Sequence, residues 1–126
     1  MAVSGYESLE LLVKIVKVAM DSRDCKFVVV WEFWIRPGDS ERFEAVYGQA
    51  GAWATLFGCD PAYGGTRLIR DERQSRRYLT LDFWASQAAY DSFQRMHAAE
   101  YRVLDAECES LTEREAEIGR FANVLG

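Results

Sequence analysis

Hydrophobic side chains occupy both faces of the stretch FVVVWEFWI, residues 27–35. Successive side chains of a β-strand point to opposite faces. One face would therefore carry Phe27, Val29, Trp31, Phe33 and Ile35, and the other Val28, Val30, Glu32 and Trp34. A strand that is covered on one side only alternates apolar with polar residues. Both faces of this strand are therefore expected to be covered, with Glu32 as the one charged residue.

The pattern after this strand predicts two helices and three more strands. A helix begins at Asp39 or Ser40 and runs to Phe57, with its apolar positions at helical spacing: Phe43, Val46, Tyr47, Ala50, Trp53, Ala54 and Phe57. Ser86 caps a second helix, whose expected buried stripe is Ala89, Phe93, Met96, Leu104 and Cys108. Strands are expected at 63–70, 76–84 and 116–125, and LTERE (111–115) as a polar turn of helix or a loop.

Residues 1–25 form an N-terminal extension to a domain that spans 26–126. Apolar residues in this extension fit one helical face, but its β-branched residues also suit a strand, so a helix is preferred and a strand stays open. The run LLVKIVKVAM contains Lys14 and Lys17 and is too short to cross a bilayer. Residues 1–10 lack the basic region of a secretory signal. We expect no membrane association and a cytoplasmic location.

The order strand, helix, strand, strand, helix, strand is typical of the α+β ferredoxin-like (βαββαβ) fold, in which both helices cover one face of an antiparallel sheet. The other face would be sealed by a second copy of the sheet, which predicts a homodimer. Glu32 would then lie near the dimer interface. A buried carboxylate needs a polar partner, and Arg67 or Arg70 of either chain could provide one. A structural role for Glu32 is preferred to a catalytic one.

Composition excludes several classes of function. The 126 residues are 49% hydrophobic and 13% aromatic, which suits a single domain with a substantial core. The net charge of −5, with both signs intermixed, does not indicate nucleic-acid binding. Three scattered cysteines (Cys25, Cys59 and Cys108) and one histidine make no zinc set, so we expect reduced thiols and no metal.

Three segments resemble the antibiotic biosynthesis monooxygenase (ABM) domains: FVVVWEFWIRPGDSERFEAVYG, DPAYGGTRLIRD and RYLTLDFWASQAAYDSF. The most specific element is LDFWAS, followed by Tyr90 and Phe93 in the next helix. The resemblance runs from about Phe27 to Val124. It implies a dimeric α/β barrel built from ferredoxin-like protomers, with a pocket between the sheet and the helices. In the cofactor-free monooxygenases of this family, a phenolic polyketide is oxidised there by dioxygen.

By this resemblance, His97 is the candidate for proton handling, because a near-neutral imidazole suits a general base. The expected substrate-binding walls are Trp31, Phe33, Trp53, Asp82, Trp84, Tyr90 and Phe93. The resemblance implies a small aromatic ligand and no cofactor. Each residue also has a structural interpretation: His97 as a helix-border residue, Trp84 as a core anchor, and the aromatic stripes, including Tyr47, as core.

Haem degradation is rejected. The haem-degrading relatives carry a ligand histidine where this chain has Gln94, and a strand asparagine about where it has Trp31. Two alternatives to a monooxygenase stay open: a non-catalytic ligand-binding protein on the same fold, and a polyketide cyclase or isomerase. A cavity of several hundred Å³ would favour a substrate site, and a small one a binding protein.

Overall fold

The structure is a computed structural model that describes residues 22–124. Its elements, in chain order, are η1 (Ser22–Asp24), β1 (Phe27–Ile35), α2 (Ser40–Tyr47), α3 (Ala52–Phe57), β2 (Tyr63–Arg70), β3 (Arg77–Trp84), α4 (Gln87–Met96), α5 (Ala98–Cys108), η2 (Glu109–Leu111) and β4 (Thr112–Ala122). The helix predicted within residues 1–21 lies outside the described residues.

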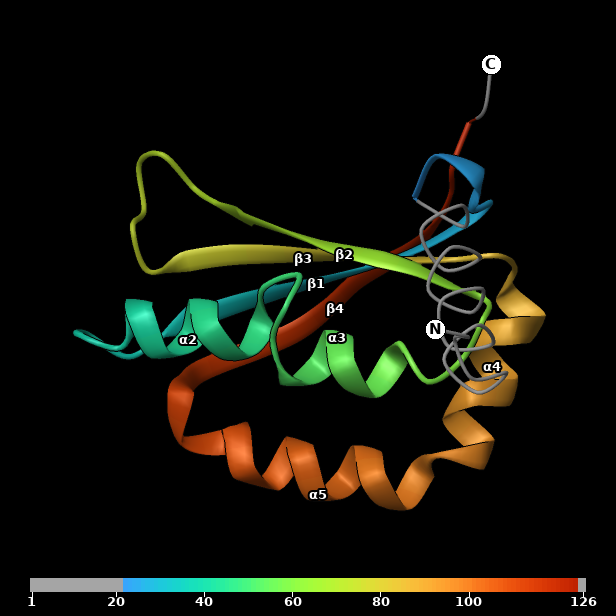
Figure 1. Ribbon diagram of the computed structural model, residues 1–126. Helices are drawn as coiled ribbons and strands as arrows, with labels where there is room; N and C mark the ends of the chain where they lie inside the picture. The colour runs from blue at the N-terminus through green and yellow to red at the C-terminus, as the bar shows by residue number, and fades with distance from the viewer. Residues whose placement is uncertain (1–21, 125–126) are drawn as a thin grey trace, which may run out of the picture.

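The strands form one antiparallel sheet in the order β2-β3-β1-β4. The helices α2, α3, α4 and α5 lie on one side of this sheet (Figure 1). This arrangement confirms the predicted α+β ferredoxin-like fold. The pairing of two such sheets into a dimeric barrel stays a prediction.

The first helix is broken into α2 and α3, so the prediction of one helix to Phe57 is wrong. The break contains two glycines that the backbone needs. A Cβ on Gly51 would lie 2.2 Å from the carbonyl oxygen of Val46, and one on Gly48 would lie 2.6 Å from that of Glu44. Without side chains, the chain turns tightly between the two helices, and Gly51 N–H donates to the Gly48 carbonyl at 2.9 Å.

The second helix begins as predicted but also breaks. Ser86 accepts a hydrogen bond from Ala89 N–H at 3.1 Å, which confirms the cap. At His97 the backbone leaves the helical region (φ −116°, ψ 26°), ending α4 and starting α5. Phe93 and Cys108 are buried as expected, but Met96 is 73% exposed. Met96 is the last residue of α4 and its side chain is exposed there, so its place in the stripe is a wrong prediction.

The last strand is longer than predicted, because β4 begins at Thr112 and includes most of LTERE. Its charged residues are poor strand formers, yet they pair with β1 from Ile35↔Thr112 to Phe27↔Ala122, with register shifts between Val30 and Trp31 and between Trp34 and Ile35. Their side chains are largely exposed, which an edge strand allows. Pairing with β1 therefore overrides local propensity here.

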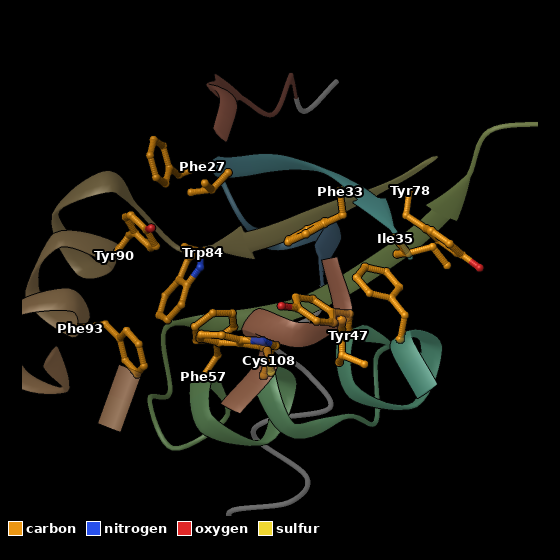
Figure 2. Close-up of a cluster of buried hydrophobic side chains, with 14 residues drawn as sticks. Phe27, Phe33, Ile35, Tyr47, Phe57, Tyr78, Trp84, Tyr90, Phe93 and Cys108 are labelled. Carbon is orange, nitrogen blue, oxygen red and sulfur yellow. The ribbon is translucent and has the colours of Figure 1, made fainter. Parts of the chain in front are cut away.

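The two faces of the sheet carry different clusters. On the helix side, residues of β1 join aromatic side chains from the helices in the main core, and Figure 2 shows Phe33, Tyr47 and Phe57 converging from sheet and helices. On the other side, Val28 and Phe83 pack with Cys25 in a smaller cluster. The sequence assignment of the two faces of β1 is confirmed.

Candidate functional site

A small cavity lies between the sheet and the helices and has a volume of about 40 Å³. That is room for a few water molecules. The sheet strands β1, β2 and β3 and the helices α2 to α5 all contribute to its wall. The lining residues are Trp31, Phe33, Tyr47, Trp53, Phe57, Thr66, Thr80, Asp82, Tyr90, Tyr101 and Asp105.

Asp82 is the buried carboxyl group of this cavity, with 7% of the residue exposed. The Thr66 hydroxyl donates a hydrogen bond to Asp82 Oδ1 at 2.6 Å. Because Thr66 has one hydroxyl hydrogen, the 2.5 Å contact between its oxygen and the Tyr63 hydroxyl makes Tyr63 the donor there. No described cation pairs with Asp82. Burial raises the pKa of Asp82 to about 6, and the Thr66 hydrogen bond acts in the opposite direction.

Strand register explains why Asp82 and Thr66 meet. Tyr78, Thr80, Asp82 and Trp84 alternate toward the helix side of β3. Thr66 on β2 is the direct cross-strand partner of Asp82. Directly opposed side chains in an antiparallel pair lie within contact distance. The sheet itself therefore holds the carboxyl group and its hydrogen-bond donor in place.

Three aromatic side chains, Trp31, Tyr90 and Tyr101, line the cavity and also a wider open hollow of about 470 Å³. This outer hollow is completed by Asp91, Gln94, Arg95, Glu117 and Arg120. The aromatic trio thus separates the inner cavity from the outer hollow. Movement of these side chains would open a route between the two spaces.

The predicted pocket residues fall into two groups. Trp31, Phe33, Trp53, Asp82 and Tyr90 line the cavity, whereas Trp84, Phe93 and His97 do not. Trp84 is fully buried behind the wall, 5.5 Å from Tyr90 and 5.6 Å from Phe57 between ring centroids. Its indole Nε1 has no hydrogen-bond partner among the described residues. The core interpretation therefore fits Trp84 and Phe93.

His97 lies outside the cavity, at the junction of α4 and α5. Its ring stacks on Phe93 with 4.8 Å between centroids, as the four-residue spacing suggests. Its nitrogens contact Cys59 Sγ at 3.7 Å and Glu100 Oε2 at 3.5 Å. All three side chains lie at the surface or partly exposed. From this position His97 does not reach the lining of the cavity.

Sequence reasoning missed several lining residues: Thr66, Thr80, Tyr101 and Asp105. A signal existed for Thr80, which alternates on the same face as Asp82. Tyr101 and Asp105 stand four residues apart, which places them on one helical face. Their direction could not be read from the sequence, because α5 restarts after the break at His97.

Glu32 lies on the opposite face of the sheet and has a cationic partner, as predicted, but not the expected one. Arg77 Nε donates to Glu32 Oε2 at 2.7 Å, and Arg77 Nη1 pairs with Asp71 Oδ2 at 3.0 Å. Arg67 and Arg70 belong to β2, which is separated from β1 by β3. The strand order therefore makes Arg77 the nearby cation.

Within residues 22–124, no group of three or more His, Cys, Asp or Glu side chains is placed to bind a metal ion. Of the helices in that same range, none has the length and apolar character required to span a membrane.

Residues 26–101 match the antibiotic biosynthesis monooxygenase family. The chain belongs to this family. The fold is similar to that of a mutant form of SnoaB, a cofactor-independent oxygenase from Streptomyces nogalater (TM-score 0.63, 17% identity, 78% of this chain and 92% of that one). It is also similar to Shewanella oneidensis protein SO0527 (TM-score 0.57, 18% identity, 82% and 95%). At these identities the likeness to solved structures shows the fold. A comparison with curated proteins gave no match.

Proposed function

We propose that this member of the ABM family is a cofactor-independent monooxygenase that oxidises a phenolic aromatic substrate with dioxygen in the inner cavity. The observation that supports this most strongly is Asp82, a carboxyl group buried in an aromatic wall with a single hydroxyl donor. Its pKa of about 6 leaves it mainly ionised at neutral pH and still basic enough to accept a proton. SnoaB, with a similar fold, is described as a cofactor-independent oxygenase.

The reaction needs a base and a dry pocket. Asp82 accepts the phenolic proton, and the electron-rich ring then transfers one electron to dioxygen. The resulting superoxide combines with the phenoxyl radical at the ring carbon para to the phenolic oxygen. The new C–O bond gives a peroxide. Asp82 returns its proton to the peroxide. Loss of the hydrogen on that carbon and cleavage of the O–O bond then release water and give a quinone. The balance is one phenol and one dioxygen to one quinone and one water, so no external reductant is required.

The other cavity residues have supporting roles in this proposal. Thr66 holds the carboxylate through its hydroxyl, and Tyr63 orients Thr66 in turn. Trp31, Tyr90 and Tyr101 would shield the reacting ring from water. Asp82 takes the proton-handling role that the sequence suggested for His97, because Asp82 is the buried carboxyl group in the cavity lining and His97 is not part of that lining.

Two alternatives use the same cavity. Its volume of about 40 Å³ favours a non-catalytic ligand-binding protein, since this is well below the size typical of small-molecule sites. A polyketide cyclase or isomerase would use the Asp82 base without oxygen. Both are distinguished from an oxygenase by the fate of dioxygen.

We also propose that the protein is a cytoplasmic homodimer joined through the outer face of the sheet. Val28 and Phe83 form an apolar cluster on that face, and Ile69 and Phe121 remain about half exposed there. Light scattering coupled to size-exclusion chromatography tests the dimer. A stable monomer at all concentrations would contradict it.

Oxygen uptake with an anthrone and with simple phenols tests the proposed activity. Wild type should consume one dioxygen per quinone formed. Asp82→Asn should lower kcat/KM by about 10²–10⁴-fold, the usual contribution of a general base. His97→Ala should leave the rate unchanged. A loss caused by His97→Ala and not by Asp82→Asn would return the proton-handling role to His97. Turnover without uptake would favour the cyclase or isomerase, and binding without turnover the ligand-binding protein.

A further inference from the structure

We infer that the inner cavity selects compact neutral phenols and rejects aromatic ligands that carry a carboxylate. This inference rests on the proposed function, since it names the substrate class of the same site. It follows from the signs and positions of the charges around the cavity.

Two carboxyl groups face the cavity from opposite sides. Asp82 lies on the sheet side, on β3, and is buried, whereas Asp105 belongs to α5 on the helix side and is also exposed to solvent. None of the described lining residues is Lys, Arg or His. A ligand placed between these walls therefore meets negative charge and hydroxyl groups, with no described cation in the lining to balance an anion.

Tyr101, which lines the cavity together with both carboxyl groups, is affected by the same negative charges. Burial raises the pKa of Tyr101, and its electrostatic interactions with Tyr90, Asp105 and Asp82 raise it further. Each of these groups disfavours a negative charge at the Tyr101 hydroxyl. Negative charge is thus disfavoured at this point of the cavity wall.

The other titratable groups near Asp82 do not offset this field. Tyr63 on β2 and Tyr90 on α4 are phenols whose pKa values burial raises, that of Tyr90 to about 12, so both are neutral at physiological pH. Tyr47 on α2 has its pKa raised by burial as well. The β1 residues in the wall, Trp31 and Phe33, do not titrate.

Two cations, Arg95 and Arg120, line the outer hollow beyond the aromatic trio. Arg120 stands over the Tyr90 ring, 5.3 Å from its centroid, and pairs with Glu117 at 3.3 Å and Asp91 at 3.6 Å. Arg95 also lines the hollow and not the cavity. A carboxylate inside the cavity would therefore lose its water without gaining a counter-charge, which is strongly unfavourable.

The size of the cavity limits the ring system. With about 40 Å³ of space, the cavity can accept a single ring after small movements of its walls more easily than a fused polyketide. A phenol also supplies a donor for Asp82, whose only described hydrogen-bond partner is Thr66. A compact ring with a neutral hydroxyl group satisfies both conditions.

A matched pair of ligands tests this selectivity without turnover. 4-Hydroxybenzyl alcohol and 4-hydroxybenzoate share the phenol ring and differ in the charge of the para substituent. Trp31 and Trp53 lie in the wall, so quenching of tryptophan fluorescence under nitrogen at pH 7 reports binding. The alcohol should bind at least about tenfold more tightly than the benzoate, because the benzoate carries an unpaired charge into the cavity.

Two variants connect the selectivity to the named charges. Asp105→Asn should reduce the preference for the alcohol severalfold by strengthening benzoate binding. Glu113→Gln is the matched control, because Glu113 is an exposed carboxylate paired with Arg76 and outside the cavity. It should leave both affinities unchanged. Circular dichroism confirms that each variant is folded.

The possible results separate the two proposals. Equal affinity for the two ligands, binding of neither, or a preference that Asp105→Asn does not reduce would each overturn the selectivity. If the alcohol binds selectively and no phenol supports oxygen uptake, the selectivity holds and the oxygenase proposal fails. Oxygen uptake together with tight binding of 4-hydroxybenzoate would overturn the proposed selectivity and support the oxygenase proposal.

Discussion

Asp82 and Glu32 are carboxylates on opposite faces of the same sheet, and their surroundings differ in nearly every respect. Asp82 faces the helices, is almost fully buried and accepts a hydrogen bond from the Thr66 hydroxyl. Glu32 faces away from the helices and pairs with Arg77 at 2.7 Å. Its side chain keeps 24% of its exposure. Asp82 is thus buried without a described cationic partner, whereas Glu32 is partly exposed and paired with an arginine.

This difference separates a reactive group from a structural one. Glu32 is held in an ion pair with the Arg77 guanidinium. Asp82 has no such partner among the described residues, so burial raises its pKa to about 6. The helix side of the sheet therefore retains proton affinity, whereas the outer side has an ion pair that fixes Arg77 between Glu32 and Asp71.

The largest expected effect comes from truncating one aromatic residue on each face. Phe33 packs 4.7 Å from Tyr47 and 5.4 Å from Phe43 between ring centroids. Phe33→Ala should lower the free energy of unfolding by about 3–5 kcal/mol, because it leaves a cavity in the core. Trp34→Ala, on the partly buried outer face, should instead lower the urea midpoint and make it depend less on protein concentration, because it weakens the proposed dimer. Identical behaviour of the two variants would contradict the contrast between the faces.

The next effect is the decrease in the free energy of unfolding when Asp82 ionises. Its pKa rises from 3.8 to about 6 on folding, so its protonated form favours the native state below pH 3.8. This contribution is lost as pH rises through 6 and amounts to about 3 kcal/mol. Asp82→Asn should therefore be more stable than wild type at pH 8 and similar at pH 4, measured by urea denaturation. Lower stability of the variant at pH 8 would show that the native carboxylate is well compensated.

Removing the hydroxyl donor to Asp82 should have a smaller effect. Thr66→Val eliminates the hydrogen bond that favours the ionised carboxylate, so the pKa of Asp82 should rise by about one unit. Thr66→Ser keeps the hydroxyl group and should preserve the wild-type value. Infrared titration of the buried carboxyl band, with Asp82→Asn as the blank, measures the pKa. An unchanged pKa in Thr66→Val would remove Thr66 from the proposed mechanism.

The smallest effect is expected on the outer face. Glu32→Gln leaves Arg77 paired with Asp71, so the melting temperature should fall slightly, and the difference from wild type should shrink in 1 M NaCl. Oxygen uptake should remain at the wild-type rate. A large loss of activity in this variant would show that the two carboxylates are coupled through the sheet.

Much of the fold could be predicted because its signals are local. The bounds of β2, the Ser86 cap and the two apolar faces of β1 follow from alternation and from residue types at fixed positions. The breaks at residues 48–51 and at His97 could not be predicted as easily. Glycine at Gly48 and Gly51 is compatible with a helix, and only the close approach of other backbone atoms requires it.

The site was harder to predict from the sequence than the fold. Alternation along β3 places Asp82 toward the helices, but the depth of its burial depends on how four helices close over the sheet. Its pairing with Thr66 depends on strand register, which no single segment encodes. His97 shows the converse: its spacing from Phe93 correctly suggests a contact, but the helix ends there and the ring lies outside the cavity.

The charged character of β4 also affects how the protein behaves at high concentration. Within the described sheet β4 pairs only with β1, so its other side is a free edge that could recruit a strand from another molecule. Glu113, Arg114, Glu115 and Glu117 are all exposed along this edge. Adding a strand would bring such charges close together and strip their water, which opposes edge-to-edge aggregation. The charged residues that made LTERE look like a turn or loop in the sequence thus protect the edge strand against pairing with other molecules.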